Sequence, residues 1–396
     1  KYVIVGGGLA GAGAVEGIRE VDKEGSILLV GAEGDAPYDR PPLTKQLWTG
    51  GKRVEEIFVH PAEFYAERGV ALRLGTRVAE VDVVGHHVRE AGGAVIGYEK
   101  LLLATGGTPR RLGIPGGELE GVNYYRTLGD YRALRAQVGA GKSAVVIGGG
   151  FIGSEIAAAL TMNQVGVTMI FPDGWVGSRV FPEGLGRAIT EHYREKGVRV
   201  LAGERAGLIE RSGERYVVQT VGGKKVEADV VVVGVGIVPN VGLAEAAGLT
   251  VGDGIVVDAF LRTSDGDVYA AGDVAYFPEE VLGSRRVEHW DNAVSQGKQV
   301  GRNMAGANER FTGMPFFFSD LFEFGYEAVG DVDSRLETFA DWKEENRTGV
   351  IYYVGEGRVR GAMMCNVWEK VDAARALIRK GERVRAEDLR GAIALG

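Results

Sequence analysis

Two segments of the chain carry the glycine spacing that holds the phosphates of a dinucleotide. Each has a β-branched run, a G-x-G-x-x-G turn and an alanine-rich helix pattern: KYVIVGGGLAGAG at the start and KSAVVIGGGFIGSE from residue 142. The motif glycines are Gly6, Gly8 and Gly11 in the first segment, and Gly148, Gly150 and Gly153 in the second. In such a motif one glycine allows a tight turn, the second lets backbone N–H groups approach a pyrophosphate, and the third lets helix and strand pack closely. A single match is weak, but two in matching contexts predict two bound dinucleotides.

Acidic residues follow both motifs at the distance at which a carboxylate holds a ribose hydroxyl. Glu33 ends the segment SILLVGAE, and Asp173 ends VGVTMIFPD. Either acid can instead be a solvated loop residue, and Pro172 leaves the register of Asp173 open. Gly272 and Asp273, in YAAGDVA, end a further strand pattern. There we expect the carboxylate to reach a ribityl or ribose hydroxyl, and a helix to begin with its N-terminus toward a phosphate.

The elements that must position these residues follow the same order in two parts of the chain. Residues 70–106 and 198–236 both alternate short strand patterns with turns and end in an apolar strand. Each half therefore predicts a Rossmann-like unit with an antiparallel meander inserted before its last strand. The run VVVVGVGIV at 230–238 is too short to span a membrane and is typical of a buried parallel strand.

The last part of the chain has a different texture. From about residue 310 the sequence becomes aromatic and hairpin-like, and the helix pattern VWEKVDAARALIRKGE closes it. The whole chain therefore predicts an α/β fold with two Rossmann-like dinucleotide-binding domains plus a C-terminal α+β domain.

Composition narrows the class of protein. A length of 396 residues suggests two or three domains. A net charge of −8 with interspersed signs argues against nucleic-acid binding. The single cysteine, Cys365, allows neither an internal disulfide nor a cysteine-cluster metal site, so we expect no metal and a reducing, cytoplasmic setting. Because the chain opens directly on a strand, we expect no leader, although the missing initiator Met leaves a trimmed N-terminus open.

Together these features resemble the flavoproteins of the glutathione-reductase fold, the pyridine nucleotide-disulphide oxidoreductase fold. Within them the chain resembles the branch of NAD(P)H:ferredoxin and rubredoxin reductases, oxygenase-coupled reductases, and apoptosis-inducing factor with its bacterial relatives. The most specific marks are PYDRPPLTKQLW, YYRTLGDYRAL, GGGFIGSE, YAAGDVA, RVEHWDNAVSQG and FFFSDL…GYEAVG.

Three segments, IFPDGWVG, FFFSDLFEFGYEAVG and GVIYYV, lean toward the apoptosis-inducing-factor side of this branch. Nothing in the sequence looks like a mitochondrial address or a long basic surface, so a bacterial-type reductase is favoured. The resemblance covers essentially the whole chain. It implies an FAD-binding domain of residues 1–110 and 236–308, an NAD(H)-binding domain of residues 111–235, and an interface domain of residues 309–396.

The resemblance also implies a catalytic pair. Lys45, of the RPPLTK motif, is expected beside the flavin N5 and paired with Glu155, of GGGFIGSE. From the residues alone, Glu155 follows Gly153 on the first turn of a helix, where a carboxylate is commonly just a favourable partner of the helix dipole. A fixed ammonium at Lys45 would stabilise the charge that a flavin gains on reduction. The alternative is a solvated lysine at a helix start.

Further cofactor contacts follow from the matching motif positions. Arg40 is expected to face the flavin or its phosphates. Glu288, His289 and Trp290 are expected near the pyrimidine end of the flavin, where a helix N-terminus would stabilise the reduced ring; His289 can instead be a surface histidine, and Trp290 simple packing. The remaining flavin contacts are Leu9, Val78, Gly106, Arg126 and Asp273. The nicotinamide-side contacts are Gly149, Phe151, Ile152, Asp173 and Gly236.

These expectations describe an FAD-dependent NAD(P)H oxidoreductase that takes a hydride at flavin N5 and passes electrons to a small redox protein such as ferredoxin or rubredoxin. Asp173 would repel a 2′-phosphate, which favours NADH, while Arg179 leaves NADPH open. Disulfide chemistry needs at least one cysteine on the helix that faces the flavin, whereas the only cysteine, Cys365, falls in the last domain. Cys365 is more typical of a buried small hydrophobic residue than of a redox group. The alternative function is a redox sensor like apoptosis-inducing factor, with slow turnover and NADH-dependent dimerisation. We expect a monomer or homodimer without nucleic-acid or membrane partners.

Overall fold

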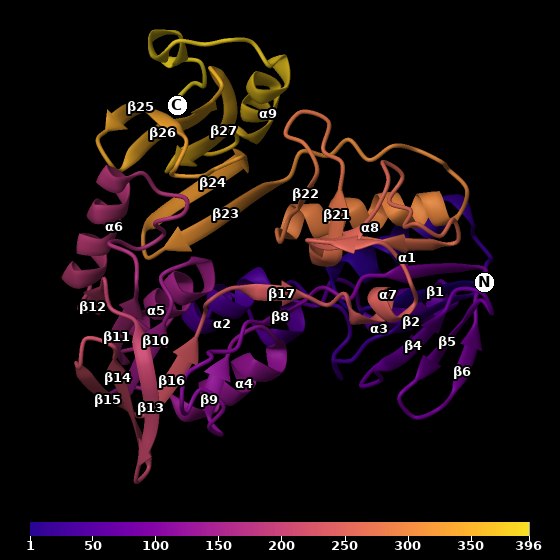
Figure 1. Cartoon of the computed structure of the whole chain (residues 1–396), viewed down its shortest axis with the longest axis horizontal. Coiled ribbons are helices and arrows are strands. Elements are labelled where there is room, and N and C mark those ends of the chain that lie inside the picture. Colours follow the sequence, from indigo (N-terminus) through magenta and orange to yellow (C-terminus); the bar gives the residue numbers. More distant parts are fainter. Residues whose placement is uncertain (396) are drawn as a thin grey trace. The chain divides into compact units, whose positions relative to one another are not determined.

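The computed structural model describes residues 1–395, and the chain divides into two compact units. Unit 1 contains Lys1–Asp39, Val54–Thr108 and Val238–Phe316. Unit 2 contains Arg40–Arg53, Pro109–Ile237 and the chain from Phe317 onward. The chain passes between the units five times: on each side of Arg40–Arg53, within β8 (Gly107–Pro109), within β17 (Ile237–Pro239), and between Phe316 and Phe317. Helices and strands carry the labels of Figure 1.

Unit 1 is built on a five-stranded parallel sheet in the order β20-β7-β1-β2-β3. Apart from the edge strand β3, its strands are almost continuously apolar and buried, as expected for a parallel sheet that is covered on both faces. The strands are β1 (Tyr2–Val5), β2 (Ile27–Val30), β3 (Val70–Arg73), β7 (Lys100–Leu103) and β20 (Val268–Ala270). The fifth strand therefore comes from a segment more than 160 residues after the fourth.

Two helices of unit 1, α1 (Leu9–Val21) and α8 (Trp290–Met304), pack against each other through glycines. A Cβ atom on Gly17 would collide with the carbonyl oxygen of Lys298, and one on Gly301 with that of Ala14. The glycines thus let the two helix backbones approach closely.

The other elements of unit 1 are short. They are the antiparallel sheet of β4 (Val78–Asp82), β5 (His87–Glu90) and β6 (Val95–Gly97); the sheet of β18 (Val251–Gly252), β19 (Gly254–Val256), β21 (Ala275–Phe277) and β22 (Arg285–Arg286); α3 (Ala62–Glu67) and α7 (Gly242–Ala246); and the 3₁₀ turns η2 (Val54–Glu56) and η3 (Gly272–Val274).

Unit 2 repeats the same sheet. Its order is β12-β11-β10-β16-β9, all parallel, which matches the sheet of unit 1 strand by strand when β10 is placed on β1. The strands are β9 (Val122–Tyr124), β10 (Ser143–Ile147), β11 (Gly166–Phe171), β12 (Arg199–Ala202) and β16 (Val230–Val233). The antiparallel meander is β13 (Ala206–Ser212), β14 (Arg215–Thr220) and β15 (Lys225–Ala228). The helical elements are η1 (Pro41–Thr44), α2 (Gln46–Thr49), α4 (Leu128–Gln137), α5 (Phe151–Met162) and α6 (Glu183–Glu195).

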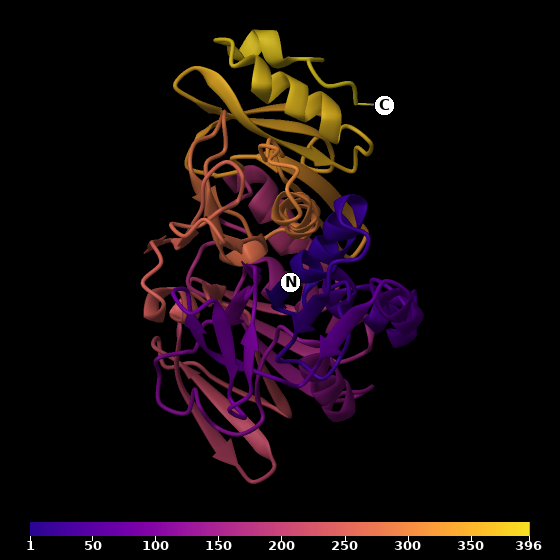
Figure 2. The same cartoon turned by 90° about the vertical axis from the view of Figure 1, so that its right-hand side faces the viewer.

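Unit 2 also contains the C-terminal sheet, in the order β23-β24-β27-β26-β25. Helix α9 packs against β24 and β27, and Figure 2 shows it in yellow beside these strands. The elements are β23 (Phe316–Leu321), β24 (Phe324–Gly330), β25 (Glu337–Glu344), β26 (Thr348–Gly355), β27 (Arg358–Cys365), α9 (Val371–Lys380) and the 3₁₀ turn η4 (Ala386–Leu389).

The fold predicted from the sequence is confirmed: two Rossmann-like sheets, a meander in each, and a C-terminal α+β part. One local prediction is wrong. Gly272 and Asp273 do not begin a regular helix but lie in the single turn η3, after which β21 pairs with β19. Gly272 has a φ of +79°, and the following Ala-Tyr-Phe sequence favours an extended strand with a partner. The helix of this region is α8, which begins at Trp290.

Among the described residues, no helix is long and apolar enough to cross a membrane. The same part of the chain contains no group of three or more His, Cys, Asp and Glu residues that could hold a metal ion.

Candidate functional site

The first and third glycines of both motifs are required by the backbone. Gly6 and Gly148 have φ angles of +134° and +123°, and a Cβ atom on either would collide with a carbonyl oxygen, of Ala104 and Gly234 respectively. A Cβ atom on the third glycine, Gly11 or Gly153, would collide with the carbonyl oxygen of the first. Helix and strand therefore lie too close for any side chain, as a dinucleotide-binding turn requires.

The middle glycines behave differently. Gly8 and Gly150 are the N-cap residues of α1 and α5, and neither helix has a side-chain cap. A Cβ atom on Gly8 or Gly150 would have nothing within 4 Å. Each motif thus presents an uncapped helix N-terminus beside open space, where backbone N–H groups and the helix dipole favour a phosphate. Both turns fit the pyrophosphate of a dinucleotide.

The two acids that follow the motifs lie close after their strands. Glu33 is half-buried, three residues beyond β2, and its Oε2 accepts a hydrogen bond of 2.5 Å from the Tyr38 hydroxyl. Asp173 is exposed, two residues beyond β11, and its backbone carbonyl accepts a bond from the Gly203 amide. The ribose-binding role of both residues stays a prediction.

Lys45 and Glu155 are brought together within unit 2. Lys45 lies between η1 and α2, and its Nζ is 3.3 Å from Glu155 Oε1. The sequence predicted Glu155 on the first turn of its helix, but α5 begins at Phe151, so Glu155 lies in the second turn. Lys45 and Glu155 are only 8% and 7% exposed. A second carboxylate, Asp320 Oδ2, lies 3.5 Å from Lys45 Nζ, and the ammonium lies over the Phe318 ring at 4.5 Å. The ammonium is therefore buried with ionic and aromatic partners.

The segment around Lys45 is held by aromatic residues. Trp48 Nε1 and the Tyr125 hydroxyl both donate to the carbonyl of Leu43, at 2.8 and 2.5 Å. The two prolines of the motif begin η1, where their missing N–H groups cost no hydrogen bond. This part of the chain is thus a fixed turn on α5 rather than a loose loop.

Glu155 has two hydroxyl partners of its own. The Thr44 hydroxyl donates to Oε2 and the Ser319 hydroxyl donates to Oε1, each at 2.5 Å. Two fully buried tyrosines, Tyr193 and Tyr326, lie near the carboxylate, and burial raises the pKa of both phenols well above the usual value. These phenols are therefore neutral at neutral pH.

Unit 1 groups another set of predicted residues around the start of α8. His289 is the N-cap of α8, and burial lowers its pKa to about 4, while Asp273 opposes this shift. The Gly272 amide donates to the buried side chain of Gln296 at 2.9 Å. Trp290 is 37% exposed, and its indole N–H donates to Asp39 Oδ1 at 2.7 Å. Glu288 is exposed and accepts from Arg286 at 2.5 Å.

Two glycines occupy equivalent places after β7 and β16, the strands that pair with β1 and β10. Gly106 and Gly236 have φ angles of +62° and +93°, and their carbonyls accept from the amides of Asn240 and Arg110. Leu9 and Phe151 are the first residues of α1 and α5, Ile152 follows in α5, Gly149 precedes it, and Val78 begins β4. Arg40 donates to the carbonyl of Arg126 at 2.8 Å, and both belong to unit 2 with Lys45.

The sequence analysis did not predict three residues whose side chains contact Lys45 or Glu155: Thr44, Ser319 and Asp320. The segment FFFSDL was noted only as a family mark, and Thr44 only as part of the lysine motif. Ser319 lies 164 positions from Glu155, and no local pattern indicates that the two meet.

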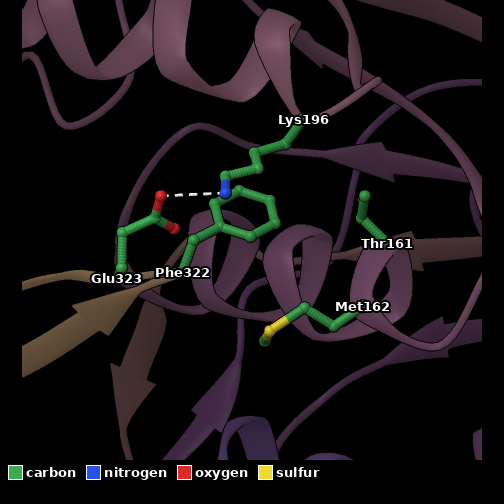
Figure 3. A pocket seen from close by; sticks show the side chains of 5 residues that line it. All are labelled: Thr161, Met162, Lys196, Phe322 and Glu323. Carbon is green, nitrogen blue, oxygen red and sulfur yellow. Dashed lines mark ion pairs between the residues drawn. The ribbon is translucent and has the colours of Figure 1, made fainter.

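An open hollow of about 430 Å³ lies elsewhere in unit 2 (Figure 3). It is lined by Thr161, Met162, Lys196, Phe322 and Glu323. Lys196 is paired with Glu323 at 2.8 Å and lies over the Phe322 ring. Thr161 is ten residues beyond the start of α5, about 15 Å along the helix axis, so the hollow is separate from the phosphate-facing helix end.

Comparisons with known proteins agree with this geometry. The profile of the pyridine nucleotide-disulphide oxidoreductases matches residues 1–297, and that of the C-terminal domain of mitochondrion-associated apoptosis-inducing factor matches residues 300–348. The chain is 37% identical over 383 residues to the ferredoxin–NAD(+) reductase component of the anthranilate 1,2-dioxygenase system of Burkholderia cepacia, covering 96% of this chain and 94% of that protein. It is 36% identical to mitochondrial apoptosis-inducing factor 1 of Dictyostelium discoideum, covering 98% and 80%.

Among solved structures, the chain is similar to the covalent putidaredoxin reductase–putidaredoxin complex. The TM-score is 0.92 at 32% sequence identity, with 98% of this chain and 95% of that chain covered. The likeness therefore extends over both units of the chain.

Proposed function

The chain belongs to the pyridine nucleotide-disulphide oxidoreductase family, and on this premise we propose that it is an FAD-dependent NAD(P)H oxidoreductase that reduces a ferredoxin. The observation that carries the proposal is the pair of uncapped helix N-termini at Gly8 and Gly150, together with the buried cation Lys45. The names of the Burkholderia reductase and of the putidaredoxin reductase complex support a ferredoxin as acceptor. Rubredoxin is the alternative acceptor protein.

The residues have separable roles in this proposal. Bound FAD supplies the chemistry that side chains lack, accepting a hydride from the nicotinamide and releasing electrons singly. The N-terminus of α1 binds the FAD pyrophosphate and the N-terminus of α5 that of the nicotinamide nucleotide. Lys45 places a fixed positive charge where negative charge develops, in a site with little water to screen it. The N-terminus of α8, at His289, adds the positive end of a helix dipole.

We propose NADH as the preferred nucleotide. Asp173 follows β11, the strand whose end carries the ribose-binding acid in this type of fold, and its carboxylate disfavours a 2′-phosphate. Arg179 lies close in sequence and is the residue that would accept a phosphate if NADPH were used.

The domain division and remaining site residues stand as part of the same proposal. FAD would be bound by residues 1–110 and 236–308, the nicotinamide nucleotide by residues 111–235, and residues 309–396 would form the interface domain. The flavin contacts would include Arg40, Val78, Gly106 and Arg126.

The test is rapid mixing of the FAD-loaded protein with NADH, followed by addition of a ferredoxin. We expect fast loss of flavin absorbance and many turnovers of ferredoxin reduction. Replacing Lys45 with Ala should leave FAD bound but slow the reduction by NADH about a hundredfold, the lower end of the range for loss of one electrostatic stabiliser. An unchanged reduction rate in Lys45→Ala would show that the ammonium takes no part.

A second candidate function is a redox sensor similar to apoptosis-inducing factor. The match of residues 300–348 to the C-terminal domain of that factor favours it. Slow reduction, a long-lived and air-resistant charge-transfer band, and NADH-dependent dimerisation would favour the sensor over the reductase. Fast ferredoxin reduction would exclude it.

A further inference from the structure

Ser319 connects the C-terminal sheet to the Glu155 carboxylate. It lies on the edge strand β23, is 1% exposed, and donates to Glu155 Oε1 at 2.5 Å. Thr44, from the turn before Lys45, donates to the other oxygen at the same distance. Each oxygen of the carboxylate therefore has a hydroxyl donor of its own.

Lys45 meets Glu155 less closely. Its Nζ lies 3.3 Å from Oε1, and Asp320 offers a second carboxylate at 3.5 Å. Charge-assisted hydrogen bonds are shorter, at about 2.7–2.9 Å for an ammonium and a carboxylate. The short bonds of Glu155 thus come from the two hydroxyls, so the hydroxyls determine where its negative charge lies relative to Lys45.

The position of Ser319 on β23 is fixed by contacts at the tip of the β23–β24 hairpin. Phe322 and Glu323 join β23 to β24, and Phe322 adopts a φ of +59°, which is unusual for an aromatic residue. Its ring packs edge-on against Tyr193 of α6 at 5.0 Å, and Glu323 pairs with Lys196 at the end of that helix. The hairpin is thereby held at both its tip and Ser319.

We infer that Ser319 is a positioning residue for the Lys45–Glu155 pair, and that the C-terminal sheet belongs to the reductive site through it. The inference rests on the proposed function, because that proposal alone sets Lys45 beside the flavin. Ser319 does not act on the reacting atoms. Its hydroxyl holds the Glu155 carboxylate at a fixed distance from the Lys45 ammonium. The extent to which the carboxylate offsets the positive charge of Lys45 is therefore the same at every turnover.

The experiment is a double-mutant cycle of Ser319→Ala and Glu155→Ala in the FAD-loaded full chain. It measures the rate of flavin reduction by NADH, the Kd of NADH, and the urea denaturation midpoint. Ser319→Ala should slow reduction about tenfold, since a hydrogen bond to a charged group is worth at least that factor, with the Kd changed less than about twofold. In the Glu155→Ala background, Ser319→Ala should have almost no further effect on the reduction rate or the denaturation midpoint, because the carboxylate that Ser319 contacts is absent.

Two further variants make the result specific. Ser319→Thr keeps the hydroxyl and should recover most of the rate. Thr338→Ala removes a hydroxyl from β25, at the opposite edge of the same sheet, and should leave the rate unchanged.

Equal slowing by Ser319→Ala with and without Glu155, or a rate equal to that of Thr338→Ala, would overturn the inference. Failure of the proposed function would look different, since the unchanged protein itself would then not be reduced by NADH. If Ser319→Ala does not fold, Thr44→Val tests the same carboxylate from its other oxygen and should also lose its effect in the Glu155→Ala background.

Discussion

At the scale of single residues, the Lys45 ammonium lies near two carboxylates that differ in solvent exposure. Glu155 is buried, whereas the side chain of Asp320 is 47% exposed. Water screens the exposed carboxylate, so its attraction for the ammonium is the weaker of the two. Removing the buried partner would leave an uncompensated charge in a dry place, which costs about 3–5 kcal/mol. Glu155 is therefore the partner that keeps Lys45 in the core.

His289 makes the stability of the protein depend on pH. Burial lowers its pKa to about 4, against about 6.5 in an unfolded chain. Between about pH 4 and 6.5 the unfolded state thus binds a proton that the folded state does not, so this residue costs stability as the pH falls through that range. We expect the denaturation midpoint to fall more between pH 7 and pH 5 in the unchanged protein than in His289→Gln.

The matched control for this prediction is His86→Gln, since His86 is a half-exposed histidine of the same unit. It should keep the pH dependence of the unchanged protein. Parallel loss of stability in the unchanged protein and in His289→Gln would contradict the prediction.

At the scale of elements, the glycine turns before α1 and α5 have nearly the same structure. In both, the first and third glycines allow strand and helix to touch, and the middle glycine opens the helix N-terminus. Stability and nucleotide binding therefore depend on different glycines of one motif.

This separation predicts opposite results for two alanine variants in the second motif. Gly150→Ala, whose methyl group would enter open space, should fold normally but weaken NADH binding about tenfold, or about 1.4 kcal/mol. Gly153→Ala would press a methyl group on the Gly148 carbonyl and should lower the free energy of unfolding by about 1–3 kcal/mol. Thermal unfolding and NADH titration of both variants check this. Weakened NADH binding in Gly150→Ala together with a large loss of stability would refute the separation.

At the scale of the whole molecule, the presence of a single cysteine argues against electron transfer through a pair of thiols. Cys365 is the single cysteine of the sequence, it lies fully buried in β27, and burial raises the pKa of its thiol. A dithiol relay needs two accessible thiols, so electrons must leave through a different route.

N-ethylmaleimide should therefore modify only a small fraction of Cys365 in the native protein. The rate of reduction by NADH should stay unchanged. After unfolding in urea, the same thiol should react fully. Rapid modification of the native protein with loss of activity would show that the thiol is exposed and takes part.

Much of the molecule follows from local features of the sequence. Glycine spacing and the strand and helix patterns around it depend on neighbouring residues, so they predicted both Rossmann-like sheets and both meanders. The prediction of a helix after Gly272 was wrong, because Gly272 adopts a positive φ and the Ala-Tyr-Phe sequence that follows favours a strand, which pairs with β19.

The sequence by itself thus determined the class of fold and the family, since repeated motifs of fixed spacing have few structural solutions. Only the tertiary structure decided which residues distant in sequence come into contact. It places β20 as the fifth strand of the first sheet, Asp39 as the partner of Trp290, and Ser319 as the partner of Glu155. These contacts join residues far apart along the chain. Their energy arises from packing and hydrogen bonding that exist only after the chain has folded, so no local pattern records them.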